Sequence, residues 1–163
     1  MKFANLHPRR GLIAAAVLAA GVTLAGSAFA GSCPANQMRP NGGGEKMNSI
    51  PASGVTDNVL TSIDLAKEPA AVKGRLLRLR RLEIQPGGVV PWHSHGDRPA
   101  IIYIIQGEIV EYSSSCAVPI VHRAGEVATE THVTAHWWKN TGTETVVLLS
   151  ADLFPVTGDK HMM

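Results

Sequence analysis

Residues 87–107 read GGVVPWHSHGDRPAIIYIIQG and contain a pair of histidines followed by an apolar run. His93 and His95 are separated by one residue, so on a β-strand both imidazoles point to the same face. Gln85-Pro86-Gly87-Gly88 favours a type II turn just before them, because proline presets φ and glycine accepts a positive φ. The run Ala100–Ile105 is apolar at nearly every position. We therefore expect both faces of that strand to be covered, one by the core and the other by a second layer or a partner subunit.

From Leu76 onward the sequence alternates short apolar runs with turn residues, a pattern typical of an all-β sandwich or barrel. The strands that we expect are Leu76–Ile84, Val89–His95, Ala100–Gln106, Glu108–Tyr112, Val118–His122, Val133–Trp138 and Thr145–Phe154. Residues 31–56 are rich in Pro, Gly, Ser and Asn, which predicts an irregular arm. The predicted organisation is a signal peptide over 1–30, an N-terminal arm over 31–75, a barrel over 76–154 and a C-terminal tail over 155–163.

The histidine pair is part of a longer spaced pattern that resembles the two sequence motifs of the cupin superfamily. The first motif matches at Gly87, His93, His95 and Gly107, and the second matches at Gly125, His136 and Asn140. The resemblance spans about residues 76–154. It implies a jelly-roll β-barrel that holds a divalent metal ion through His93, His95 and His136. Cupins commonly pair, so it also implies a homodimer.

Two departures from the family pattern concern the metal site. The first motif usually has a glutamate where this chain has Ala100, and the second usually has Pro and Gly at Thr131 and Val133. A methyl group cannot bind a metal, so the fourth ligand is open. Asp97 and His132 are candidates for it. Alternatively, the site has only three histidines, as in the thiol dioxygenases, and the open position admits substrate or O₂.

Imidazole ligands suit Fe, Cu, Ni and Zn, and Mn is also possible, so the sequence does not identify the metal. A catalytic site also needs an acid or base close to the metal, and the carboxylates to check are Glu108, Glu126 and Glu130. Arg98 is either a surface arginine or a partner for an anionic substrate. Trp138 shares the strand parity of His136, so we expect its indole inside the barrel.

The first 30 residues predict export. Lys2, Arg9 and Arg10 precede a short apolar run, and Ala28 and Ala30 fit the small-residue pattern of a cleavage site. The paired arginines resemble a twin-arginine signal, although ordinary signals also contain them. Cleavage after residue 30 leaves 12 basic against 13 acidic side chains. Without a net positive charge, nucleic acid is not an expected partner, and we expect no membrane contact beyond the signal.

Cys33 and Cys116 are the two cysteines. An even number in an exported chain favours a disulfide, which would tie the arm to the barrel. The alternative is a lipid-modified Cys33, because the residues before it loosely resemble a lipoprotein site.

Two functions of different class fit these features. The first is a periplasmic or secreted metal-dependent enzyme, oxygenase-like, that acts on a small molecule. The second is a non-catalytic cupin of the same compartment that binds a small ligand or a metal. The fold alone does not choose between them.

Overall fold

One long strand, β2 (Arg75–Ser94), connects the two halves of the barrel in the computed structural model, which describes residues 31–40 and 42–157. Its first half pairs with β8 up to Ile84, and from Val89 it pairs with β7. The sequence predicted two strands separated by a turn here, which is wrong. Gly87 does have a positive φ of 76°, yet the chain bends at this point without reversing and changes its pairing partner.

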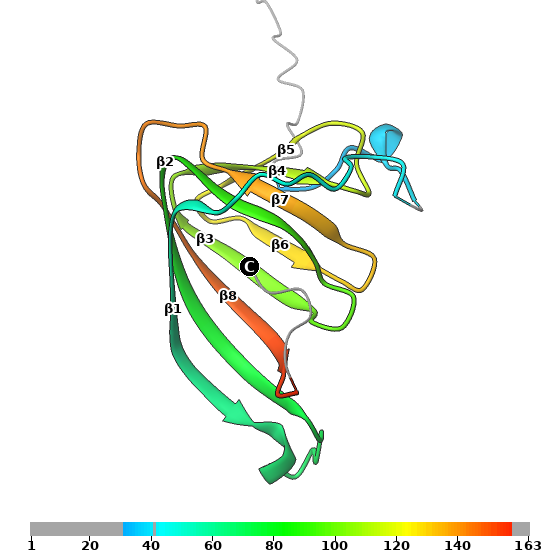
Figure 1. Ribbon diagram of the computed structural model, residues 1–163, viewed down its shortest axis with the longest axis vertical. Helices are drawn as coiled ribbons and strands as arrows, with labels where there is room; N and C mark the ends of the chain where they lie inside the picture. Colours follow the sequence, from blue (N-terminus) through cyan, green and yellow to red (C-terminus); the bar gives the residue numbers. More distant parts are fainter. Residues whose placement is uncertain (1–30, 41, 158–163) are drawn as a thin grey trace, which may run out of the picture.

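All eight strands belong to one antiparallel sheet, rolled into a nearly closed barrel (Figure 1). The hydrogen-bonded order is β5-β4-β7-β2-β8-β3-β6, and β1 pairs with the outer part of β2. The chain is therefore an all-β jelly-roll barrel, as predicted. The other strands are β1 Ser53–Asp64, β3 Ala100–Gln106, β4 Glu108–Ser113, β5 Ile120–Arg123, β6 Val127–Glu130, β7 Ala135–Lys139 and β8 Val146–Pro155.

Two of these strands were not expected. β1 lies within the stretch 31–75 that was predicted as an irregular arm, and it extends with β2 beyond the barrel in Figure 1. Its residues are nearly all exposed, so it lacks the alternating burial that marks a strand in sequence. β6 has only four residues, too few for an alternating pattern to be recognised.

A one-residue irregularity in β2 changes the direction of its side chains at His93. Val90 pairs with Trp138 and His93 pairs with His136, so three steps on β2 match two steps on β7. Upstream of this bulge the even-numbered Arg80, Leu82, Ile84 and Val90 are buried, whereas after it the odd-numbered His93 and His95 are buried. The extra residue therefore directs both histidines into the barrel.

The barrel interior is closed by an apolar cluster from several strands. Ile84, Ile104, Ile109 and Val146 are fully buried in it, and Trp138 is nearly so. Trp138 thus lies inside the barrel, as its parity predicted. This cluster fills one part of the interior. Buried polar side chains, among them His93 and His136, occupy the other part.

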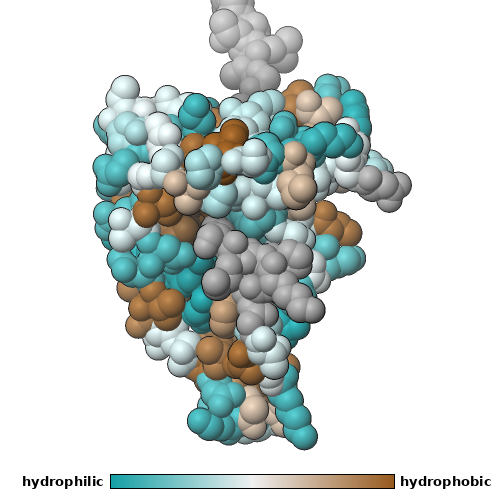
Figure 2. Space-filling model, in the orientation of Figure 1, coloured by the Kyte–Doolittle hydropathy of each residue, from teal (hydrophilic) through white to brown (hydrophobic). Residues whose placement is uncertain are grey.

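The outer face of β3 is not covered within one chain. Ile101, Tyr103 and Ile105 are between 44% and 56% exposed. The sequence predicted that a second layer or a partner subunit covers this face, and within the described residues of one chain no second layer does so. Hydrophobic surface is also visible toward the end where β1 and β2 extend (Figure 2), where Leu60, among others, is exposed. Within the described ranges, no helix has the length and apolar character needed to cross a membrane.

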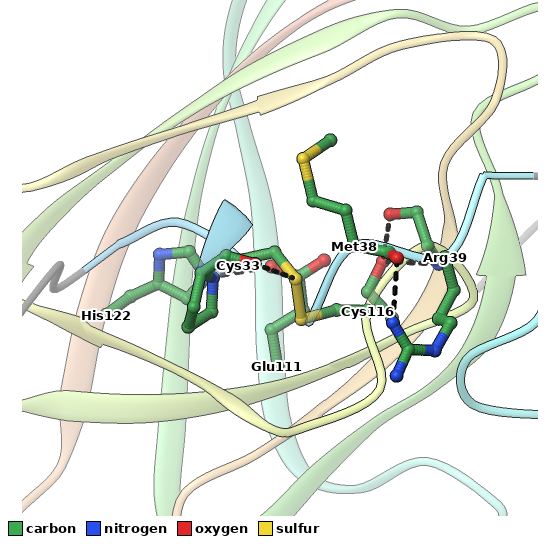
Figure 3. Close-up of a disulfide and its surroundings, with 9 residues drawn as sticks. Cys33, Met38, Arg39, Glu111, Cys116 and His122 are labelled. Carbon is green, nitrogen blue, oxygen red and sulfur yellow. Dashed lines mark hydrogen bonds and ion pairs between the residues drawn. A yellow bond between two sulfur atoms is a disulfide. The ribbon is translucent and has the colours of Figure 1, made fainter. Parts of the chain in front are cut away.

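The arm is fixed to the barrel by a disulfide between Cys33 and Cys116, as predicted, with a Cα–Cα distance of 5.7 Å (Figure 3). Backbone hydrogen bonds from Arg39, Gly44 and Glu45 to residues 113–115 hold the following segment. The sulfur of Cys33 is used in this bond, so the lipid alternative is not supported. A disulfide is typical of proteins from oxidising compartments. The predicted signal at 1–30 lies outside the described residues.

Candidate metal centre

Three histidines from two paired strands meet inside the barrel. His93 on β2 is the direct register partner of His136 on β7, and His95 follows immediately after β2. The Nε2 atom of His136 lies 3.2 Å from the Nε2 atoms of both His93 and His95. All three side chains are buried. The convergence predicted from their spacing is therefore observed.

A fourth side chain, Glu130, joins this group from the end of β6. One of its carboxylate oxygens lies 2.7 Å from His95 Nε2, and the other lies 3.3 Å from His136 Nε2. Glu130 is only 4% exposed. The ligating atoms of all four residues lie within 4.8 Å of one another, so the group could hold a metal ion. The alternative of three histidines beside an open position therefore needs correction, because a carboxylate lies at that position.

The second nitrogen of each histidine has its own acceptor. His93 Nδ1 lies 2.9 Å from the carbonyl oxygen of Pro91, and His95 Nδ1 lies 2.8 Å from that of Arg98. His136 Nδ1 lies 2.7 Å from a carboxylate oxygen of Glu111. A carbonyl or carboxylate only accepts, so each Nδ1 carries the proton. Each Nε2 then presents its lone pair to the common centre.

Glu111, on β4, supports the group from behind. Its second oxygen accepts a hydrogen bond from His122 Nε2 on β5, at 2.8 Å. The imidazole of His122 stacks on Trp138, with ring centroids 4.6 Å apart. The indole of Trp138 also lies against the ring of His136, with its Nε1 3.0 Å from Nδ1 and 3.4 Å from Nε2. A carboxylate partner such as Glu111 fixes the orientation of a ligand and raises its basicity.

Burial and charge move the pKa values of these groups in opposite directions. Burial, aided by the nearby His136, holds the pKa of His93 well below its usual value. Burial alone would also lower the pKa of His136, but the carboxylates of Glu130 and Glu111 outweigh it and raise that pKa. Burial would raise the pKa of Glu111, yet the hydrogen bonds from His122 and His136 hold it well below the usual range. The shift therefore keeps Glu111 ionised at neutral pH.

The other candidates from the sequence lie away from the group. Asp97 and His132, considered as fourth ligands, are both exposed in turns. Glu108 is paired with Arg123 on the surface, and Glu126 accepts a hydrogen bond from the Arg123 backbone. Of the three carboxylates to check, only Glu130 points inward.

Arg98 is not a surface arginine. It is 2% exposed and lies 3.7 Å from a carboxylate oxygen of Asp152. Arg78 and Arg80 also pair with this carboxylate, so three arginines surround one buried aspartate. Sequence reasoning missed this cluster. The signal was available, because Arg78 and Arg80 share the parity of Leu82 and Ile84 on a strand with a buried face.

The comparisons with known proteins agree with this architecture. Residues 80–152 match the family model described as "Cupin domain". A curated relative, "Auxin-binding protein ABP19a" of Prunus persica, is 33% identical over 63 residues, which cover 35% of this chain and 30% of the relative. The match thus spans less than a third of that relative's length.

Two solved structures share the fold. One is an uncharacterized conserved protein with a double-stranded beta-helix domain from Klebsiella pneumoniae, with a TM-score of 0.51 and 16% identity over 76% of this chain and 88% of that one. The other is the cupin domain of Cnp3 from Schizosaccharomyces pombe, with a TM-score of 0.50 and 18% identity over 70% of each chain. At these identities the likeness concerns the fold.

Proposed function

This chain belongs to the cupin superfamily, and from that premise we propose that it is an exported metalloprotein that acts on a small molecule. The metal ligands would be His93, His95, Glu130 and His136. The observation that carries this proposal is the convergence of three imidazole lone pairs and one carboxylate on a single buried point. Without a metal ion or a bound proton, that arrangement would bring electron-rich atoms together in a buried space.

The donor set fits a divalent transition metal. Ligand atoms about 2 Å from one ion lie roughly 3–3.5 Å from each other, and the two Nε2–Nε2 distances are 3.2 Å. Three imidazoles and one carboxylate suit Fe, Mn, Cu, Ni or Zn. When bound, such an ion supplies Lewis acidity or redox chemistry. The chain's own residues would orient it, through the carboxylate of Glu111, and exclude water, through the wall formed by Trp138.

Elemental analysis of the protein purified from its native compartment tests the metal proposal. We expect about one transition-metal ion per chain, and we expect a His136→Ala variant to lose it. His132→Ala is the matched control, since His132 lies in the neighbouring turn and is exposed. Protein that contains no metal and takes up none on reconstitution would overturn the proposal.

We propose the enzyme ahead of a binding-only module because a metal ion held at this site would itself supply Lewis acidity or redox chemistry. The alternative, a non-catalytic cupin that binds a small ligand or metal, predicts metal binding without turnover. Screening the metal-loaded protein against small oxidisable or hydrolysable molecules separates the two.

We also propose a periplasmic or secreted location, supported by the disulfide and by the signal pattern at 1–30. N-terminal sequencing of the mature protein should then begin at Gly31. A start at Met1 would contradict it.

A homodimer through the outer face of β3 is supported by the exposure of Ile101, Tyr103 and Ile105. Light scattering should give a mass of twice the single chain for the wild-type protein. The Tyr103→Asp variant, which places a charge on this face, should give the mass of one chain. A wild-type protein that is monomeric at every concentration tested would exclude the dimer.

A further inference from the structure

The N-terminal arm forms one wall of a cavity between the two ends of the sheet. β5 and β6 are the first and last strands of the hydrogen-bonded order, and the cavity between them has a volume of about 400 Å³. Gly31 and Cys33 line it from the arm, and Glu111 and His122 line it from the barrel. The disulfide and these two barrel side chains appear together in Figure 3. A contact that holds the start of the arm therefore also holds a wall of this cavity.

Gly31 lies at the turn between β5 and β6. Its backbone N–H donates to the carbonyl oxygen of Val121 at 2.8 Å, and its φ is 84°, which favours glycine. A Cβ atom at this position would lie 3.3 Å from a carboxylate oxygen of Glu126. The backbone nitrogen is two bonds away from such a Cβ, so it lies within about 6 Å of that oxygen. The absence of a side chain allows this close approach.

The carboxylate of Glu126 can accept a further hydrogen bond. One of its oxygens accepts from the backbone N–H of Arg123 at 2.7 Å, and a carboxylate has acceptor capacity for several donors. The backbone of Glu126 is fixed by hydrogen bonds with Arg123 and Ile104. The guanidinium of Arg123 pairs with Glu108 instead, and among the described residues no cation pairs with Glu126. A negative charge beside the start of the arm is thus without an ionic partner there.

Cleavage after residue 30 would change the chemistry of the Gly31 nitrogen. In the uncleaved chain this nitrogen is a neutral amide with a single N–H, which Val121 already accepts. Hydrolysis of the peptide bond consumes one water molecule, leaves a carboxylate on residue 30 and frees the amino group of Gly31, which takes up a proton. The resulting ammonium keeps the bond to Val121 and has two further N–H donors for Glu126. Opposite charges at about 4–6 Å stabilise each other.

We propose that the amino group created by cleavage after Ala30 pairs with the carboxylate of Glu126 and fastens the arm against the cavity. The inference rests on the proposed export and cleavage. The disulfide at Cys33 already orders the arm, so the ion pair costs little additional conformational entropy. Removal of the signal then does more than release the chain, because it supplies the charge that completes the attachment of the arm.

Thermal unfolding of four proteins tests the pair. They are the mature protein and its Glu126→Gln variant, each with a free or an acetylated Gly31 amino group. Acetylation removes the charge and keeps one N–H for Val121, and glutamine removes the charge and keeps an acceptor for Arg123. Each single change should lower the melting temperature by about 2–4 °C. The double change should lower it no further, because both changes remove the same interaction.

The reactivity of the amino group gives a second measurement. Only an unprotonated amine is acylated, and an ion pair with Glu126 favours the ammonium form. At pH 7 the Gly31 amine of the wild-type protein should react at least threefold more slowly than that of Glu126→Gln, as measured by mass spectrometry. Glu68→Gln is the matched control, since Glu68 is exposed in the connection between β1 and β2, far from the arm in Figure 1. It should change neither the melting temperature nor the rate.

N-terminal sequencing comes first and separates the two proposals. A mature chain that starts at a residue other than Gly31 would overturn the proposed cleavage and this inference with it. A chain that starts at Gly31, but whose melting temperature does not change on acetylation, would overturn the inference alone. Additive losses from acetylation and Glu126→Gln would do the same, because the two groups would then act independently.

Discussion

Ala100 and Glu130 are direct register partners in the β3–β6 ladder, and both are buried. Ala100 stands where the family's first motif usually has its glutamate. The carboxylate that is absent from position 100 is present on the residue opposite it, within 2.7 Å of His95 Nε2. Side chains directly opposite in a ladder have Cβ atoms about 5 Å apart, so either position can deliver a carboxylate to the same point.

The first prediction exchanges these two positions. Glu130→Ala should lower metal affinity at least about tenfold, which corresponds to about 1.4 kcal/mol. Adding Ala100→Glu to that variant should restore most of the affinity, because the carboxylate returns from across the ladder. Metal titration by calorimetry measures both. Ala100→Glu alone should destabilise the metal-free protein, since two buried carboxylates then repel each other. A double variant that binds metal no more tightly than Glu130→Ala would contradict the proposed exchange of the two positions.

The second prediction concerns the carboxylate behind His136. Glu111→Gln removes the charge that orients the imidazole and raises its basicity. The loss of such a partner typically lowers metal affinity by about 10–100-fold. Competition with a chromogenic chelator gives the dissociation constants. Glu108→Gln, which removes a surface carboxylate from the same strand, should change little.

Acid stability is the third prediction. The pKa of Glu111 is depressed in the folded protein below its ordinary value of 4.5. The stability that it contributes is therefore complete above that value and is lost as the pH falls below it. The free energy of unfolding of metal-free protein should decrease from about pH 5 downward, and less steeply for Glu111→Gln. If the free energy of unfolding depends on pH equally in both proteins, Glu111 does not contribute to the acid sensitivity.

The fourth prediction is the contribution of the disulfide. It joins residues 83 apart, so the chain-entropy model gives a stabilisation of about 4–5 kcal/mol. Cys33→Ser should lower the free energy of unfolding by several kcal/mol, and the double Cys→Ser variant should lose no more than the single one. Urea denaturation measures this. Two free thiols in the oxidised, denatured protein would refute the bridge itself.

The fifth prediction follows from coupling between metal binding and folding. A metal that binds only the folded chain stabilises it by about 2.7 kcal/mol when its free concentration is 100 times the dissociation constant. Removal by a chelator should therefore lower the melting temperature, and adding the metal back should restore it. His136→Ala should melt at the same temperature with and without the chelator.

The sequence predicts the fold well where the local pattern is strong. β3 matches its expected range, Ala100–Gln106, and the ends of β4, β7 and β8 lie within two residues of those expected. It fails at β2, because proline and glycines that usually reverse a chain here only bend it. Whether such residues make a turn or a corner depends on the pairing of distant strands, which local residues do not determine.

The site could be predicted as far as its histidines. His93 and His95 follow from alternation on one strand, and His136 follows from the second motif. Glu130 could be named only as one of three carboxylates, because its place depends on the pairing of a short strand with β3. Arg80 was overlooked, since a charged residue on a strand normally faces solvent.

The single extra residue of β2 between Val90 and His93 is accommodated as a bulge, because both Val90 and His93 keep their partners on β7. Loss of one residue there would remove the bulge and place His93 two positions after Val90, on the face that Val90 already buries. An in-frame codon deletion at Pro91 or Trp92 should therefore leave both histidines directed into the barrel. Deletion of Ser94 differs, because it would make the two histidines adjacent and put their imidazoles on opposite faces of the strand.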